Sequence, residues 1–91
     1  MKQPIVAHFD IPGMSAHQYD RVIAELRDAG VGAPAARRYH VAAPKADGWF
    51  VTDVWDSAAE LDAFAKILMP ILVRNGVTPP PPKVMPVHNI M

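Results

Sequence analysis

The chain carries one carboxylate, Asp53, inside its most apolar run, residues 49–55 (WFVTDVW). Burying a charge at such a position is costly unless the charge is paired. The candidate partners are two histidines and two arginines: His8, His40, Arg37 and Arg38. A carboxylate that holds an imidazole in one tautomer turns that histidine into a general base. An Asp–Arg or Asp–His pair with a purely structural role fits the same pattern, so both interpretations stay open.

Three of the histidines, His8, His40 and His88, fall in segments with strand character. His8 and His88 lie on the first and last of these strands, which are neighbours in the sheet predicted below. We predict that His8 and His88 act as base and as proton donor or oxyanion partner, with Asp53 or His40 as the orienting group. A satisfied structural position is the alternative for each strand histidine. No metal site is predicted, because the chain has no cysteine and no spacing such as H-x-x-x-H.

Four further side chains are candidates for lining a substrate pocket. Tyr19 and Tyr39 can donate phenolic hydrogen bonds, and Asn89, next to His88, can orient dioxygen or an enolate. Trp55 offers an aromatic wall, although a place in the core or in a dimer interface fits it as well. For the two tyrosines the alternative is aromatic packing with the hydroxyl at the rim of the core.

The elements that must position these residues begin with a strand and a helix. Residues 5–9 form a short apolar run typical of a strand, and Pro12-Gly13 is a turn signal. Ser15 and Gln18 have the spacing of a capping box, which predicts a helix that begins after Ser15 and ends at Gly30. Apolar residues at helical spacing form one face of this helix: Tyr19, Val22, Ile23 and Leu26.

Residues 37–43 and 49–55 are typical of two strands joined by a hairpin at Asp47-Gly48. If these two are the central turn residues, His40 and Asp53 lie on the same face of the sheet. The facing pairs are then Ala46–Trp49, Ala42–Asp53 and His40–Trp55. A loop longer by one residue moves His40 to the opposite face, and the sequence leaves this choice open.

A second helix follows, beginning with the capping box of Ser57 and Glu60 and continuing with apolar residues at helical spacing to Leu72. Pro70 lacks an N–H and crowds the preceding turn, so we predict a kink or break near Met69 and a short second segment behind it. Residues 79–82 are all proline and predict a stiff extended lead into a last strand over 83–90.

This order of elements predicts a ferredoxin-like βαββαβ fold of the α+β class, a single domain over residues 1–91. The sheet has four antiparallel strands in the order fourth, first, third, second, and both helices lie on one of its faces. Both parities of residues 49–55 are apolar, so the other face is apolar too. We predict that this face packs against a second copy, giving a dimeric α+β barrel. A monomer with one partly wet face is the alternative.

The composition is that of a globular domain, with 51% hydrophobic and 20% charged residues. The formal net charge is zero, so neither nucleic acid nor an anionic membrane surface is predicted as a partner. The sequence shows no signal peptide and no apolar run of membrane-spanning length, which predicts a cytoplasmic protein.

Several short segments carry a resemblance to a known family: His8-Phe9, PGMS at 12–15, QYD at 18–20, YHVA at 39–42, Gly48-Trp49, VWDS at 54–57, LMP at 68–70 and PVHNI at 86–90. They are similar to a family of short bacterial proteins, usually described as monooxygenase-like, within the dimeric α+β barrel superfamily. This superfamily includes the antibiotic-biosynthesis-monooxygenase (ABM) domain. The resemblance covers the whole chain and implies the ferredoxin-like dimer.

The superfamily includes cofactor-free quinol-forming monooxygenases, haem-degrading enzymes, muconolactone isomerases and polyketide cyclases, and their pockets typically lie between the sheet and the helices of each subunit. In the cyclase branch two histidines on the first and last strands serve the reaction, which by resemblance corresponds to His8 and His88. The haem-degrading branch uses an asparagine on the first strand and a histidine on the second helix. The present chain has His8 on that strand and no histidine in that helix.

Together these observations predict a small cofactor-independent enzyme of the monooxygenase, isomerase or cyclase type. Its substrate would be an aromatic or polyketide-like small molecule, and its chemistry would begin with proton abstraction. No cofactor is expected, and haem is the one considered. The alternatives are a non-catalytic dimer that binds a small apolar ligand or haem, and a structural or stress dimer without a pocket.

Overall fold

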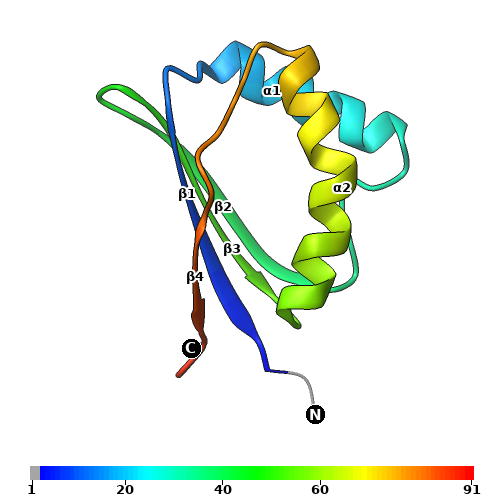
Figure 1. The fold of residues 1–91 in the computed structure, drawn as a ribbon, viewed down its shortest axis with the longest axis vertical. Coiled ribbons are helices and arrows are strands. Elements are labelled where there is room, and N and C mark those ends of the chain that lie inside the picture. The colour runs from blue at the N-terminus through cyan, green and yellow to red at the C-terminus, as the bar shows by residue number, and fades with distance from the viewer. Residues whose placement is uncertain (1–2) are drawn as a thin grey trace.

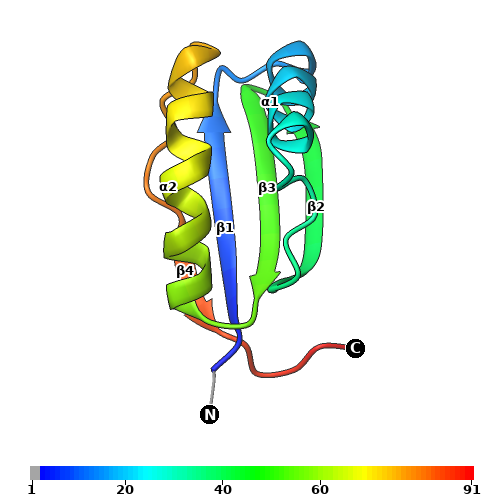
Figure 2. The same cartoon turned by 90° about the vertical axis from the view of Figure 1, so that its right-hand side faces the viewer.

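The computed structural model describes residues 3–91 and contains six elements in the order βαββαβ. They are β1 (Ile5–Pro12), α1 (Ala16–Asp28), β2 (Arg37–Lys45), β3 (Gly48–Trp55), α2 (Ala58–Arg74) and β4 (Lys83–Pro86). The four strands form one antiparallel sheet in the order β2-β3-β1-β4. Both helices lie on the same face of this sheet (Figure 1), with α1 over the β2–β3 side and α2 over the β1–β4 side (Figure 2). The predicted fold class is confirmed.

The first helix begins as its capping box requires. The Ser15 hydroxyl accepts from the Gln18 backbone N–H at 3.1 Å, and the Gln18 side chain accepts from the Ser15 N–H at 2.9 Å. These bonds satisfy two of the amide groups left free at a helix start. The helix buries Val22 and Leu26 against the sheet, and Gly30, with a positive φ of 79°, follows its C-cap. The capping box therefore fixes where α1 begins, and its buried apolar residues define the face toward the sheet.

The predicted break in the second helix is wrong, because α2 runs as a single helix through Pro70 to Arg74 (Figure 2). The proline leaves the Lys66 carbonyl without its helical partner. Both residues are exposed, so water can satisfy that carbonyl. Phe64 before the proline and Leu72 after it are both buried in the same core, so packing on both sides of Pro70 accompanies the unbroken helix.

The hairpin between β2 and β3 turns at Ala46 and Asp47, with Lys45 opposite Gly48. This differs by two residues from the register predicted with Asp47-Gly48 at its centre, and His40 therefore pairs with Asp53. Gly48 serves another purpose: a Cβ at this position would collide with the Ile11 carbonyl oxygen of β1. The glycine at position 48 therefore allows the close approach of β1 and does not lie at the centre of the hairpin turn.

The last strand is shorter than predicted, since β4 ends at Pro86 and residues 87–91 leave the sheet. In the antiparallel register Pro86 lies opposite Ile5, the first residue of β1. One further bond joins the Val87 N–H to the Pro4 carbonyl at 2.9 Å. His88 and Asn89 consequently lie in a tail and not in a strand.

The core lies between the sheet and the helices and includes Ile5, Ala7, Trp55, Phe64 and Leu72. The opposite face of the sheet also carries apolar side chains, and those nearest its β2 and β4 edges are exposed: Tyr39 by 57%, Val41 by 37% and Met85 by 44%. Within residues 3–91 neither helix combines the length and apolar character needed to cross a bilayer.

Candidate functional site

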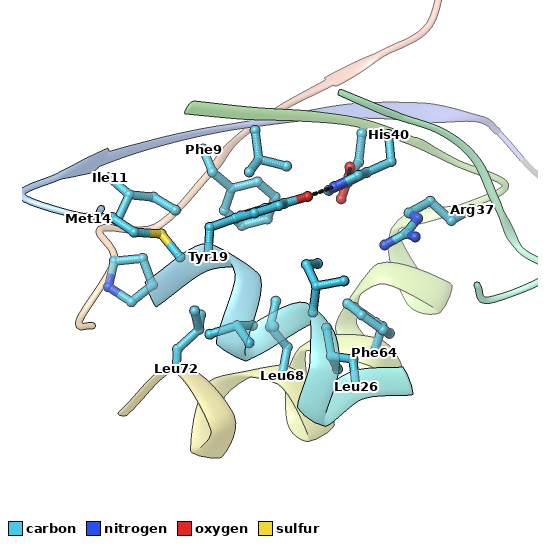
Figure 3. Close-up of a pocket in the computed structure, with 15 residues that line it drawn as sticks. Phe9, Ile11, Met14, Tyr19, Leu26, Arg37, His40, Phe64, Leu68 and Leu72 are labelled. Atoms are coloured by element: carbon cyan, nitrogen blue, oxygen red, sulfur yellow. Dashed lines mark hydrogen bonds and ion pairs between the residues drawn. The ribbon is translucent and has the colours of Figure 1, made fainter. Parts of the chain in front are cut away.

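A cavity of about 60 Å³ lies between the sheet and the two helices (Figure 3). Its walls are mostly apolar side chains contributed by β1, β3, α1 and α2, among them Phe9, Ile11, Val22, Val51, Phe64 and Leu68. Among residues 3–91, four side chains with hydrogen-bonding or charged groups line it: Tyr19, Arg37, His40 and Asp53. An apolar cavity with a few convergent polar groups is the usual form of a small-molecule site.

Three of these polar side chains form one hydrogen-bonded chain. Asp53 Oδ1 lies 2.5 Å from His40 Nδ1, and His40 Nε2 lies 2.6 Å from the Tyr19 hydroxyl (Figure 3). A carboxylate can only accept, so in the neutral imidazole Nδ1 carries the proton and Nε2 accepts from the phenol. Asp53 thus holds His40 in the tautomer whose Nε2 accepts the hydrogen bond from the Tyr19 hydroxyl.

The sheet positions this chain of bonds through its register. Asp53 is 5% exposed, and His40 lies directly opposite it on the edge strand β2. The buried carboxylate therefore has a partner, which removes most of the cost of its burial. The His40 side chain keeps 23% of its surface exposed, so a proton held there can exchange with solvent.

Helix α1 presents Tyr19 to the cavity one turn after the capping box. The Tyr19 ring packs on Trp49 with 5.2 Å between centroids and lies at 10° to the plane of His40. Burial raises the pKa of Tyr19, the nearby Arg37 cation opposes this effect, and the carboxylate of Asp53 adds to it. The phenol is consequently protonated at neutral pH and can serve as a base only while it passes its own proton to His40.

Arg37 reaches the same end of the cavity because β2 carries a bulge. Regular alternation would turn residues three apart, such as Arg37 and His40, to opposite faces. The register shifts between Arg37 and Tyr39, so Arg37 pairs with Trp55 and shares the helix-covered face with His40. The sequence analysis named Arg37 among the candidate partners for Asp53, and no sequence signal marks the bulge.

The predicted residues His8 and His88 lie elsewhere. His8 is on the open face of β1, where its Nδ1 is 3.0 Å from Thr52 Oγ1 and its ring is 5.9 Å from that of Phe50. Asp53 is opposite Ala7 and points to the other face, so it contacts His40 and not His8. His88 is exposed in the C-terminal tail.

The remaining candidates lie in the core, on the open face of the sheet and in the C-terminal tail. Trp55 is 1% exposed, packs on Phe64 with 5.1 Å between ring centroids, and does not line the cavity. Tyr39, His88 and Asn89 line a shallow groove at one end of the open face. Of the eight predicted site residues, the structure brings Tyr19, His40 and Asp53 together in the cavity.

Residues 3–91 contain no group of three histidine or carboxylate side chains arranged to hold a metal ion. No model of a known protein family matches the chain. A search of curated proteins also finds no match.

Proposed function

We propose that this protein is a small cofactor-independent enzyme that takes a proton from a small molecule held between the sheet and the helices. The observation that carries the proposal is the continuous chain Asp53–His40–Tyr19, which ends with a phenol oxygen at an apolar cavity. Proton abstraction is the first step shared by cofactor-free oxygenation, isomerisation and cyclisation. Such a step requires a base that is positioned beside the substrate, here next to an apolar surface.

In this proposal the Tyr19 oxygen accepts a proton from a C–H or O–H group of the substrate. At the same time the tyrosine proton passes to His40 Nε2, and the Asp53 carboxylate stabilises the imidazolium that forms. The products of the step are a substrate anion and a protonated His40. The proton then returns to a different atom of the substrate, or leaves through the exposed part of His40.

The size of the cavity limits what it can hold in this conformation. Its volume is about 60 Å³, whereas an apolar cavity of about 150 Å³ is known to take up benzene. An aromatic or polyketide-like substrate therefore requires α1 and α2 to move apart. A short aliphatic compound requires much less opening.

The test follows the exchange of acidic C–H protons for deuterium in D₂O, with enolisable ketones such as butanone and acetophenone as probes. Wild-type protein should accelerate exchange in a ketone that it binds, and Tyr19→Phe and His40→Gln should each slow it by about 10²–10⁴-fold. His8→Gln, on the opposite face, is the matched control and should keep the rate. Binding without any acceleration, or full activity in Tyr19→Phe, would contradict the proposal.

A second candidate is a non-catalytic module that binds a small apolar ligand. It is favoured by one observation: each bond in the chain from Asp53 to Tyr19 has a donor and an acceptor, as a purely structural network would. In that case Tyr19→Phe changes stability and leaves ligand binding and proton exchange alone. The deuterium experiment therefore separates the two candidates.

We also propose that the protein forms a homodimer through the open face of the sheet. Support comes from the apolar side chains there, including the exposed Tyr39, Val41 and Met85. Sedimentation equilibrium should report about twice the chain mass of 10.0 kDa. Val41→Asp should shift the protein to monomer, whereas Val73→Asp, at a 60% exposed position on α2, should not. A monomeric wild type would contradict the proposal.

A further inference from the structure

Arg37 lines the cavity without a charged partner. Among residues 3–91 no carboxylate lies within ion-pair distance of its guanidinium, whereas its neighbour Arg38 pairs with Asp56 at 2.5 Å. Arg37 is half-buried, so its charge is partly removed from water. A cation in this situation costs free energy that an anionic ligand can offset.

The guanidinium is held in place with most of its donors unused. One nitrogen, Nη2, donates to the Gly32 carbonyl at 3.1 Å, and the guanidinium carbon lies 5.9 Å from the centroid of the Phe64 ring. No other hydrogen bond from this side chain is seen within residues 3–91. A guanidinium has five N–H donors in a planar fork, so an unused pair remains to bind a planar acceptor.

The cation and the proton relay face the same space. Arg37 and His40 lie at one end of the cavity in Figure 3, and the bulge in β2 brings both onto the helix-covered face. The Arg37 charge also acts on the phenol, since it lowers the pKa of Tyr19 against the larger effect of burial. A ligand bound to the fork therefore lies within reach of the Tyr19 hydroxyl.

We infer that Arg37 is an anion subsite and that the ligand of this cavity is a short organic carboxylate. A carboxylate matches the fork with two parallel hydrogen bonds, and the apolar walls receive an aliphatic body. The present volume of about 60 Å³ suits a chain of a few carbons better than a ring. Resting on the proposed function, this makes the substrate a short oxo acid, which has its carboxylate at Arg37 and an enolisable C–H near Tyr19.

The test compares butyrate with butyramide, which has the same shape and no charge, in NMR titrations of the backbone amides. Wild-type protein should bind butyrate about 10- to 100-fold more tightly, the usual effect of a charge-assisted hydrogen bond. Arg37→Gln should remove this preference. Arg38→Gln, which makes the same change of charge one residue away, should retain it, and Arg37→Lys should retain part of it because the fork is lost.

Three results would overturn the inference: equal binding of butyrate and butyramide by the wild type, a butyrate preference that survives in folded Arg37→Gln protein, or no saturable butyrate binding at tens of millimolar. Circular dichroism confirms the fold of each variant, and the wild-type comparison needs no variant at all.

Tyr19→Phe separates this inference from the proposed function. That variant should keep the butyrate preference but lose deuterium exchange at C3 of 2-oxobutyrate. If wild-type protein prefers butyrate yet accelerates no exchange, the anion subsite stands and the enzymatic proposal falls. If it accelerates exchange in ketones but has no preference for butyrate, the anion subsite falls and the proton relay stands.

Discussion

Replacing His40 by leucine should expose how strongly the buried Asp53 depends on its partner. Leucine keeps most of the volume and denies water the space left by the imidazole, so the 5% exposed carboxylate loses its hydrogen bond and gains no replacement. Removing one partner of a buried pair costs about 3–5 kcal/mol. A domain of 91 residues has a free energy of unfolding of about 5–14 kcal/mol, so the loss is a large part of the total.

The assay is urea unfolding followed by tryptophan fluorescence, since Trp49 and Trp55 both lie in the core. With a slope of about 1.5 kcal/mol per molar, the midpoint should fall by about 2–3 M. Tyr19→Phe is the control and removes one hydrogen bond without isolating a charge, at a cost of about 0.5–1.5 kcal/mol. The double variant His40→Leu/Asp53→Val has no buried charge and should recover much of the loss.

If His40→Leu costs no more than Tyr19→Phe, Asp53 does not depend on His40, and the relay loses its anchor.

Three other predictions concern single positions. Because the pKa of Tyr19 is raised from 10.0, the contribution of the Tyr19 phenol to stability should be present below pH 10 and be lost as the pH rises through the raised value. Absorbance titration should show a late-ionising phenol. Tyr19→Phe should remove this signal, and Tyr39→Phe should not. The hydrogen bonds of Arg74 and Asn75 lower the pKa of Glu25 below 4.5. The difference in stability between wild type and Glu25→Gln should therefore shrink as the pH falls through that lowered value. An unchanged difference would argue against these contacts. Gly48→Ala should lower the free energy of unfolding by about 1–3 kcal/mol, because the new methyl group meets the Ile11 carbonyl. A urea midpoint equal to that of the wild type would show that the two strands do not approach so closely.

The fold could be predicted because its signals are local. The N-cap serines Ser15 and Ser57 place the starts of both helices within a residue, and the apolar run of residues 49–55 predicts a buried strand. The errors arose where distant contacts decide. The end of β4 depends on where β1 begins, and the continuity of α2 through Pro70 depends on packing on either side of the proline.

The candidate site was predicted in part for the same reason. An isolated carboxylate in an apolar strand demands a partner, and this argument correctly singled out Asp53 together with a small set that includes His40. Which partner it takes depends on register, and the hairpin turns at Ala46 and Asp47 and not at the predicted Asp47 and Gly48. The presence of Arg37 in the cavity depends on a bulge, whose only effect in the sequence is one extra residue in an edge strand.

The cavity and the proposed dimer surface lie on opposite faces of one sheet, and this arrangement makes the two proposals independent. Along β3 the side chains alternate, so Asp53 faces the helices and its neighbour Thr52 faces the open side beside His8. A second copy on the open face would cover His8 and leave the cavity end at Arg37 and His40 free. That end belongs to β2, an edge strand, where a bulge disturbs only one neighbour. The sheet can therefore devote one face to association and keep the other for ligand chemistry, and a change at Val41 tests the first without touching the second.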